Sequence, residues 1–442
     1  MDKDRRREMA EEQKKNAEPA PNGSTGQTTD PPKKKKVLSK SRIMVGEQLT
    51  KLYQDTIAAK ERGEKIGWSA SIFPQEIAEA MGLYIVYPEN HAAGLAARHQ
   101  AEEYLNYAEG EGYNMDVCSY ARINLAYMDS LTAPGNNMPK PDFVLCCNNI
   151  CNQLTKWFEN LARKFDVPMF LIDTVYNYTP TASEEKVKYV RNQIDEYIKG
   201  LEELTGKKLD PAKLEHVMRV SLRNKDLWRK ANELLAHKPS PLTGFELFNY
   251  MSCMVCCRGK ESTTAILEQL ISEIDENLKT GKSTFPVEEK YRIFWEGIAC
   301  WPYLGHTLKT LRNYGVNLVA TGYVNAWGLE YEVNDLDGLA RAYIDLPNNN
   351  NNLDTIVARR VEAVKQFQCD GVVYHVNRSC KVMDCQQYEL QRRVQEGTEV
   401  PYMAFDGDQA DFRAYSEAQY ETRVQAFVEL MEEAKRQRGD GE

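Results

Sequence analysis

The stretch Phe143-Val-Leu-Cys-Cys-Asn-Asn-Ile-Cys151, followed by a helical pattern over Gln153–Lys164, decides the fold. Its apolar part is short and continuous and gives way to polar residues and then to a helix, which is typical of a buried strand in a parallel sheet. The same succession of apolar run and helical pattern recurs at Ile66–Ser69, Tyr84–Tyr87 and Met169–Ile172. Alternation of strand and helix predicts a doubly wound α/β domain over residues 39–182.

The alternation stops after this domain and later returns. Residues 183–288 are mostly helical in pattern, and four further apolar runs follow at Arg292–Ile298, Val316–Thr321, Gly371–His375 and Tyr402–Phe405. We therefore predict an α/β protein with two doubly wound parallel-sheet domains of the Rossmann or flavodoxin-like type, joined by a helical segment. The second α/β domain is expected at residues 289–442. Residues 1–38 are charged and lack a hydrophobic period, so we predict a disordered tail.

Composition limits the function classes. The net charge of the 442 residues is −9, which argues against nucleic acid and anionic membranes as general partners. The sequence has no apolar run long enough to span a bilayer. Its N-terminus is charged and lacks the apolar core segment of a secretory signal. We expect a cytoplasmic protein.

Eleven cysteines in a cytoplasmic protein need an explanation, because a disulfide framework is not expected in a reducing compartment. Cys151 follows a strand, Cys380 lies just beyond another, and Cys118 stands in a polar loop. Such positions can stabilise thiolates and can meet in a cleft between two α/β domains. Three thiolates with one open position suit a [4Fe–4S] cluster, although soft ligands also accept zinc. Without a CxxC array, spacing alone favours core thiols.

The remaining cysteines are interpreted as buried small side chains. Cys146 belongs to a strand, and Cys253, Cys256 and Cys257 lie in an apolar helical stretch. By default, Cys300, Cys369 and Cys385 are interpreted in the same way. The acidic segment Asp406-Gly-Asp-Gln-Ala-Asp411 lacks the spacing and terminal Glu of an EF-hand, so we favour a turn that shapes the cleft mouth over a calcium loop. No GxGxxG follows a strand, so a nicotinamide cofactor is not indicated.

Six segments together resemble the α-subunit of 2-hydroxyacyl-CoA dehydratases, a family whose members act on hydroxyisocaproyl-, phenyllactyl-, lactoyl- or hydroxyglutaryl-CoA. The resemblance runs from about Ser39 to Lys435. The segments are Gly67-Trp-Ser-Ala-Ser71, Tyr87-Pro-Glu-Asn90, Cys118-Ser-Tyr-Ala-Arg122, Cys146-Cys-Asn-Asn-Ile-Cys151, Asn377-Arg-Ser-Cys-Lys381 and Phe405-Asp-Gly-Asp-Gln-Ala-Asp411.

The resemblance implies a heterodimer with a homologous β-subunit, each subunit holding its own [4Fe–4S] cluster. In this chain the matching cluster ligands are Cys118, Cys151 and Cys380, which leave one iron without a protein ligand. The family's catalytic Ser and Glu match Ser71 and Glu89. A separate ATP-dependent iron–sulfur activator supplies one electron. Whether FMN accompanies the clusters, as in some members, stays open.

The implied reaction is a reversible loss of water from an (R)-2-hydroxyacyl-CoA to an (E)-2-enoyl-CoA. The β proton is not acidified by the thioester, so a general base alone cannot remove it at a useful rate. One added electron gives a ketyl radical anion that expels the hydroxyl, after which the β C–H is far more acidic. Glu89 or the iron-bound hydroxide then serves as base, Ser71 donates to the thioester oxygen, and the electron is recycled. The steric course, syn or anti, is left open.

Alternatives stand beside this interpretation. Ser71 also fits a helix cap before Phe73-Pro74, and Glu89 a carboxylate in a turn. A related reductase, of the benzoyl-CoA reductase or double-cubane type, would share fold and cysteine pattern. A structural or electron-carrier protein would hold zinc or a fully ligated cluster. The acyl chain of the substrate is not determined by the sequence.

Overall fold

The structure is a computed structural model that describes residues 38–346 and 352–439, and the chain from Ser39 onward forms one compact unit. The predicted tail over residues 1–38 lies outside the described residues except for Leu38. The predicted division of the rest at residues 182 and 288 stays a prediction, although it coincides with where the sheets begin and end along the chain.

The first part of the unit alternates between helices and short buried strands. Its elements are α2 (Lys40–Glu61), β1 (Ile66–Ser69), α3 (Gln75–Ala80), β2 (Tyr84–Val86), α4 (Pro88–Ala97), α5 (Glu102–Gly110), α6 (Ser119–Ser130), β3 (Phe143–Cys147), α7 (Asn152–Phe165) and β4 (Met169–Ile172). All four predicted strands are present. The second strand ends one residue early, because Tyr87 is the N-cap of α4 and Pro88 occupies its first turn, where proline is tolerated.

These strands form one parallel sheet in the order β2-β1-β3-β4. Gly67 in β1 allows the central strands to pack closely, since a Cβ there would lie 2.5 Å from both Ile85 and Phe143. Helices pack on the sheet, with α7 against β3 and α8 (Glu184–Thr205) against β4. All-parallel sheets covered by helices are buried on both faces, which explains the continuous apolar runs.

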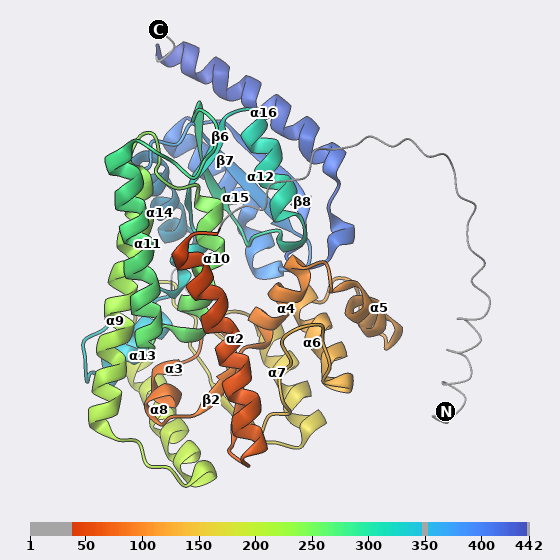
Figure 1. Ribbon diagram of the computed structural model, residues 1–442, viewed down its shortest axis with the longest axis vertical. Helices are drawn as coiled ribbons and strands as arrows, with labels where there is room; N and C mark the ends of the chain where they lie inside the picture. The colour runs from red at the N-terminus through yellow and green to blue at the C-terminus, as the bar shows by residue number, and fades with distance from the viewer. Residues whose placement is uncertain (1–37, 347–351, 440–442) are drawn as a thin grey trace, which may run out of the picture. The chain divides into compact units, whose positions relative to one another are not determined.

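Long helices follow, as predicted for the middle of the chain. After α8 they are α9 (Pro211–Glu233), the short η1 (Leu234–Ala236), α10 (Gly244–Cys257) and α11 (Glu261–Thr280). Figure 1 shows α9 and α11 running side by side along one edge of the compact unit.

The second sheet comes after these helices and repeats the organisation of the first. Its elements are β5 (Tyr291–Glu296), η2 (Trp301–Tyr303), α12 (Leu304–Asn313), β6 (Val316–Thr321), η3 (Val324–Trp327), α13 (Leu336–Ile344), α14 (Leu353–Gln366), β7 (Gly371–Asn377), α15 (Lys381–Thr398), β8 (Tyr402–Gly407), η4 (Phe412–Ala414) and α16 (Glu417–Arg438). The strands are parallel in the order β6-β5-β7-β8, so the prediction of two parallel sheets is confirmed.

Two buried arginines tie the central helices to their surroundings. Arg258, at the end of α10, pairs with Glu76 of α3 at 2.9 Å and donates to the carbonyl of Phe73. Arg292, in β5, donates to the carbonyls of Leu235 and His237 after α9. A buried charge is tolerated only when it is paired and hydrogen-bonded, so these contacts fix the helices against both sheets.

Among the described helices, none combines the length and the apolar character that crossing a membrane requires.

Candidate functional site

A cavity of about 380 Å³ opens where loops from the carboxyl ends of both sheets meet. This is where parallel α/β sheets bind ligands. The first half of the chain contributes Ser71, Ile72, Glu89, Cys118, Tyr120, Ile150, Cys151, Asn152, Gln153, Leu154 and Trp157 to its lining; the second half contributes Ile298, Tyr323, Ala326, Trp327, Leu346, Ser379, Cys380, Lys381, Val382, Met383 and Gln409.

All three cysteines that the resemblance matched to cluster ligands line this one cavity. Each of them is the N-cap of a helix: Cys118 of α6, Cys151 of α7 and Cys380 of α15. Three helix N-termini, which carry partial positive charge and unpaired backbone N–H groups, therefore meet at the cavity. Such an environment stabilises anionic sulfur.

Hydrogen-bond donors already point at these sulfurs. The backbone N–H of Leu154 donates to Cys151 Sγ at 3.4 Å, and Gln409 Nε2 donates to Cys118 Sγ at 3.2 Å. Burial raises the pKa values of Cys118 and Cys380, and hydrogen bonds from the backbone N–H groups of Ala121 and Met383 lower them only in part. Donors of this kind orient ligand thiolates and tune the group that they bind.

Burial separates these three thiols from the other eight. All eleven cysteines lie in the described part of the chain; Cys118, Cys151 and Cys380 are half-buried, and seven others are buried. The prediction of buried side chains is thus confirmed for Cys146, Cys300, Cys369 and the three cysteines of α10. It is wrong for Cys385, which is exposed because it lies on the outer face of the amphipathic helix α15.

The three thiols form a soft donor set, which fits an iron–sulfur cluster and would also accept zinc. Among the residues that the structure describes, no group of three or more His, Cys, Asp or Glu is placed to hold one metal ion. Burial raises the pKa of all three thiols, that of Cys380 to about 12, and a charge on Cys380 or Cys151 raises the pKa of Cys118 further. Three thiolates in this cavity would need positive charge between them, and an iron–sulfur cluster would supply that charge.

Ser71 and Glu89 lie on the first-half side of the same cavity. Ser71 follows β1, and its backbone N–H donates to Glu89 Oε2 at 2.6 Å. The helix-cap alternative for Ser71 is wrong, because the N-cap of α3 is Pro74. Glu89 stands in the first turn of α4 rather than in an isolated turn, where the helix dipole favours a carboxylate.

Lost hydration dominates the electrostatics of Glu89. Burial raises the pKa of its carboxyl, and the hydrogen bonds from Ser71 lower it only in part. Burial, and to a smaller extent the charge on Glu89, raises the pKa of Cys151, and both side chains line the same cavity. A carboxylate with a raised pKa is a stronger base than an exposed one.

The acidic segment begins with the last two residues of β8, Asp406 and Gly407, and continues as a hydrogen-bonded turn, as favoured from the sequence. Asp408 Oδ1 accepts the backbone N–H groups of Ala410 and Asp411, each at 2.9 Å. The backbone N–H of Ser379 donates to the other carboxylate oxygen. With its oxygens used in this way, Asp408 shapes the cavity rim and presents Gln409 to Cys118.

Several polar lining residues have no assigned role in the sequence analysis, among them Tyr120, Tyr323 and Gln409. Tyr120 and Gln409 lie inside segments that carried the resemblance, next to Cys118 and Asp408. Tyr323 gives no signal of its own, since a tyrosine shortly after a strand is more often a packing residue.

Comparison with known proteins identifies the family. Residues 70–431 match the family model described as "2-hydroxyglutaryl-CoA dehydratase, D-component". The chain is 49% identical to the (R)-2-hydroxyisocaproyl-CoA dehydratase alpha subunit of Clostridioides difficile, over 90% of this chain and 97% of that protein. It is 50% identical to the (R)-phenyllactyl-CoA dehydratase alpha subunit of Clostridium sporogenes, over 85% and 91%.

A more distant relative bears on the reductase alternative. One subunit of the benzoyl-CoA reductase of Thauera aromatica is 24% identical over 90% of this chain and 96% of that protein. Identity is about twice as high to the two dehydratase subunits, over a similar share of the chain. The chain therefore belongs to the 2-hydroxyacyl-CoA dehydratase family.

Proposed function

We propose that the chain is the α-subunit of an iron–sulfur (R)-2-hydroxyacyl-CoA dehydratase, which reversibly removes water to give an (E)-2-enoyl-CoA. One observation carries the proposal: three half-buried cysteines, each capping a helix, line the cavity that also holds Ser71 and Glu89. A site for acyl transfer or hydride transfer would not need three such thiols.

Cys118, Cys151 and Cys380 would hold a [4Fe–4S] cluster with one iron left for the substrate. When bound, such a cluster supplies a Lewis-acidic iron for the thioester oxygen and a reservoir for the single electron that the reaction needs. The donors Leu154 and Gln409 would hold two of the thiolates in place.

Ser71 and Glu89 would divide the remaining work. The Ser71 hydroxyl donates a hydrogen bond to the thioester oxygen as negative charge develops there. Glu89 accepts the β proton, and burial suits it to this role because a raised pKa makes the carboxylate more basic. The backbone N–H of Ser71 holds the Glu89 carboxylate in position, so the two groups act from a fixed geometry.

The cavity favours an apolar acyl chain. Among its described lining residues, the charged side chains are Glu89 and Lys381. Lys381 Nζ donates to the Arg378 carbonyl at 2.6 Å and lies 3.8 Å from Asp116, so it is already engaged. A second substrate carboxylate would find no ready cation among these lining residues, whereas Trp157, Trp327 and their neighbours suit branched or aromatic chains. The two relatives near 50% identity are named for such acyl groups.

We further propose three features that relatives' names or the family suggest: a homologous β-subunit with its own cluster, an ATP-dependent iron–sulfur activator, and a cytoplasmic location. An FMN in the complex stays an open part of the proposal. The alternative, membership of a benzoyl-CoA-reductase-like or double-cubane reductase, is less well supported because identity to the reductase relative is lower.

The proposal is tested with the chain co-purified anaerobically with its β-subunit. A panel of (R)-2-hydroxyacyl-CoAs with branched, aromatic and dicarboxylic acyl groups is supplied with activator and ATP. We expect 2-enoyl-CoA from branched or aromatic substrates, detected as a mass loss of one water. Reduction of the acyl group instead, or no product from a preparation with intact clusters, would overturn the proposal.

A further inference from the structure

Cys118 and Cys380 line the same cavity but come from different halves of the molecule. Cys118 begins α6 in the first half, and Cys380 begins α15 in the second. A cluster bound to both would require their separation to be fixed to a fraction of an ångström. Two loops from separate sheets do not hold such a spacing unless other groups connect them.

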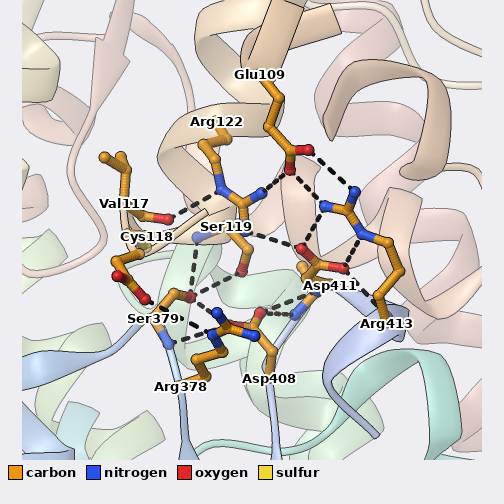
Figure 2. Close-up of polar contacts among 12 residues, drawn as sticks. Glu109, Val117, Cys118, Ser119, Arg122, Arg378, Ser379, Asp408, Asp411 and Arg413 are labelled. Carbon is orange, nitrogen blue, oxygen red and sulfur yellow. Dashed lines mark hydrogen bonds and ion pairs between the residues drawn. The ribbon is translucent and has the colours of Figure 1, made fainter. Parts of the chain in front are cut away.

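A buried serine makes that connection. Ser379, directly before Cys380, is completely buried. Its hydroxyl oxygen accepts the backbone N–H of Ser119, the residue directly after Cys118, at 3.1 Å. The same hydroxyl donates to the carboxylate of Asp408. One side chain therefore links the neighbours of both cysteines (Figure 2).

Asp408 holds Ser379 in place through hydrogen bonds to its carboxylate. Its Oδ2 also accepts the backbone N–H of Ser379 at 3.2 Å, while Oδ1 accepts two backbone N–H groups of its own turn. Asp408 is 1% exposed, so these charge-assisted bonds are shielded from water. The position of the Ser379 hydroxyl is thereby determined by β8 as well as by β7.

A second connection runs parallel to the first. Arg122 of α6, 1% exposed, donates to the Val117 carbonyl just before Cys118 at 3.0 Å. It also pairs with Glu109 and, at 3.0 Å, with Asp411 of the turn after β8 (Figure 2). The loop around Cys118 is thus tied to the second half on both sides of the cysteine.

From these contacts we propose that Ser379 is a positioning residue, which sets the separation of Cys118 and Cys380 for a shared cluster. The inference rests on the proposed function only in naming the cluster as the group held. Replacing Ser379 by Ala would leave the Ser119 N–H without its acceptor and remove one donor from Asp408. The two loops could then move apart although each cysteine remained in place.

The variants separate this role from general stability. S379A removes the link. S119A removes the hydroxyl that accepts a long hydrogen bond, 3.5 Å, from Ser379 Oγ but keeps the backbone N–H that donates to Ser379, so it should behave almost as the wild type. S240A is the matched control, because Ser240 is equally buried, donates to the Leu242 carbonyl and lies outside the cavity lining.

The first readout is cluster retention in the anaerobic complex with the β-subunit. In S379A, iron and sulfide should be lost to a chelator on the order of 10- to 100-fold faster than in the wild type, the range known for partners of metal ligands. S119A and S240A should retain the cluster. Equal retention in S379A, or an equally fast loss in S240A, would overturn the proposal.

The second readout needs no cluster. In the metal-free full chain, a bifunctional thiol reagent should crosslink Cys118 both to Cys380 and to Cys151, since the three thiols line the same cavity. S379A should lose the Cys118–Cys380 product and keep the Cys118–Cys151 product. If this happens but the wild type binds no cluster, the positioning role stands and the proposed function fails. Unchanged yields of both products would refute the positioning role.

Discussion

The two halves of the molecule share one architecture and differ in what they bring to the cavity. Their sheets have corresponding orders, β2-β1-β3-β4 and β6-β5-β7-β8. In each, the third strand along the chain ends in a loop whose cysteine caps the next helix: Cys151 after β3 and Cys380 after β7. The halves therefore contribute one cysteine each from corresponding positions.

The two halves differ in the residues that follow their first two strands. After β1 and β2 the first half presents Ser71 and Glu89, whereas after β5 and β6 the second half presents Ile298, Tyr323 and Trp327. The first half supplies the proposed reacting groups, and the second half supplies mainly an apolar wall. The topology thus determines where the cavity forms, and the residues at the strand ends determine the chemistry of that cavity.

The largest loss of activity is expected from replacing the two cysteines at corresponding positions of the halves, Cys151 and Cys380. C151S and C380S should each abolish dehydration to below detection and remove the cluster absorption, because each deletes one of the three proposed ligands. Iron, sulfide and activity are measured in the anaerobic complex. C385S, at an exposed cysteine of α15, is the control and should keep all three at wild-type level. If the cluster is retained in either C151S or C380S, the two cysteines do not play equivalent roles.

The next effect probes a group that only the first half provides. E89Q keeps an amide oxygen for the Ser71 N–H but cannot accept the β proton, so kcat should fall about 10²- to 10⁴-fold, the usual contribution of a general base. Cluster content should not change. In the wild type, activity should fall as pH drops through the raised pKa of Glu89. This acidic decrease in the pH–rate profile should be absent in E89Q.

Stability gives E89Q a second test with a definite sign. A carboxyl whose pKa is raised on folding stabilises the protein below its unfolded pKa, and this contribution is lost as pH rises through the folded pKa. At neutral pH, E89Q should therefore be at least as stable as the wild type in thermal unfolding. A clear loss of stability at neutral pH would mean that the ionised carboxylate supports the fold.

A smaller effect is expected at Ser71. S71A keeps the backbone N–H that holds Glu89 and removes only the hydroxyl donor. The rate should fall on the order of 10²-fold, as when one donor to a developing oxyanion is removed. S71T should restore much of the rate. Equal rates for S71A and the wild type would exclude the hydroxyl from the reaction.

The smallest effect concerns the apolar wall of the second half. W327A enlarges the cavity and should shift the ratio of kcat/KM between a bulky aromatic and a small aliphatic substrate roughly ten-fold toward the bulky one, a typical effect of pocket size. Iron content should be unchanged. Equal changes for all substrates would show that Trp327 supports the fold rather than selecting the acyl chain.

The fold could be predicted from the sequence for a physical reason, whereas the roles of the cysteines come from the family resemblance and stay a prediction. Continuous apolar strands alternating with helices leave few alternatives to parallel sheets, and all eight predicted strands are present with ends shifted by at most a few residues. Cys118, Cys151 and Cys380 lie next to strand or helix ends, where parallel sheets gather their ligands. Their actual meeting in one cavity depends on how two sheets pack, which no local pattern contains.

Other features were beyond local reasoning. Cys385 was expected to be buried, but the helix turns it outward, because which face of α15 meets the sheet depends on tertiary packing. Ser379 and Asp408 lie in quoted segments, yet their link to Ser119 joins residues 260 positions apart. Tyr323 acquires a place at the cavity only through the packing of η3.

In the proposed reaction, the cavity formed by both halves eliminates water with an electron that is recycled. The most direct measurement counts enoyl-CoA molecules formed per electron, using the anaerobic complex, the activator, ATP and a limiting amount of reductant. We predict many product molecules per electron, with none from C380S. A yield of one product for each electron pair, with the acyl group reduced, would contradict the account and favour a reductase.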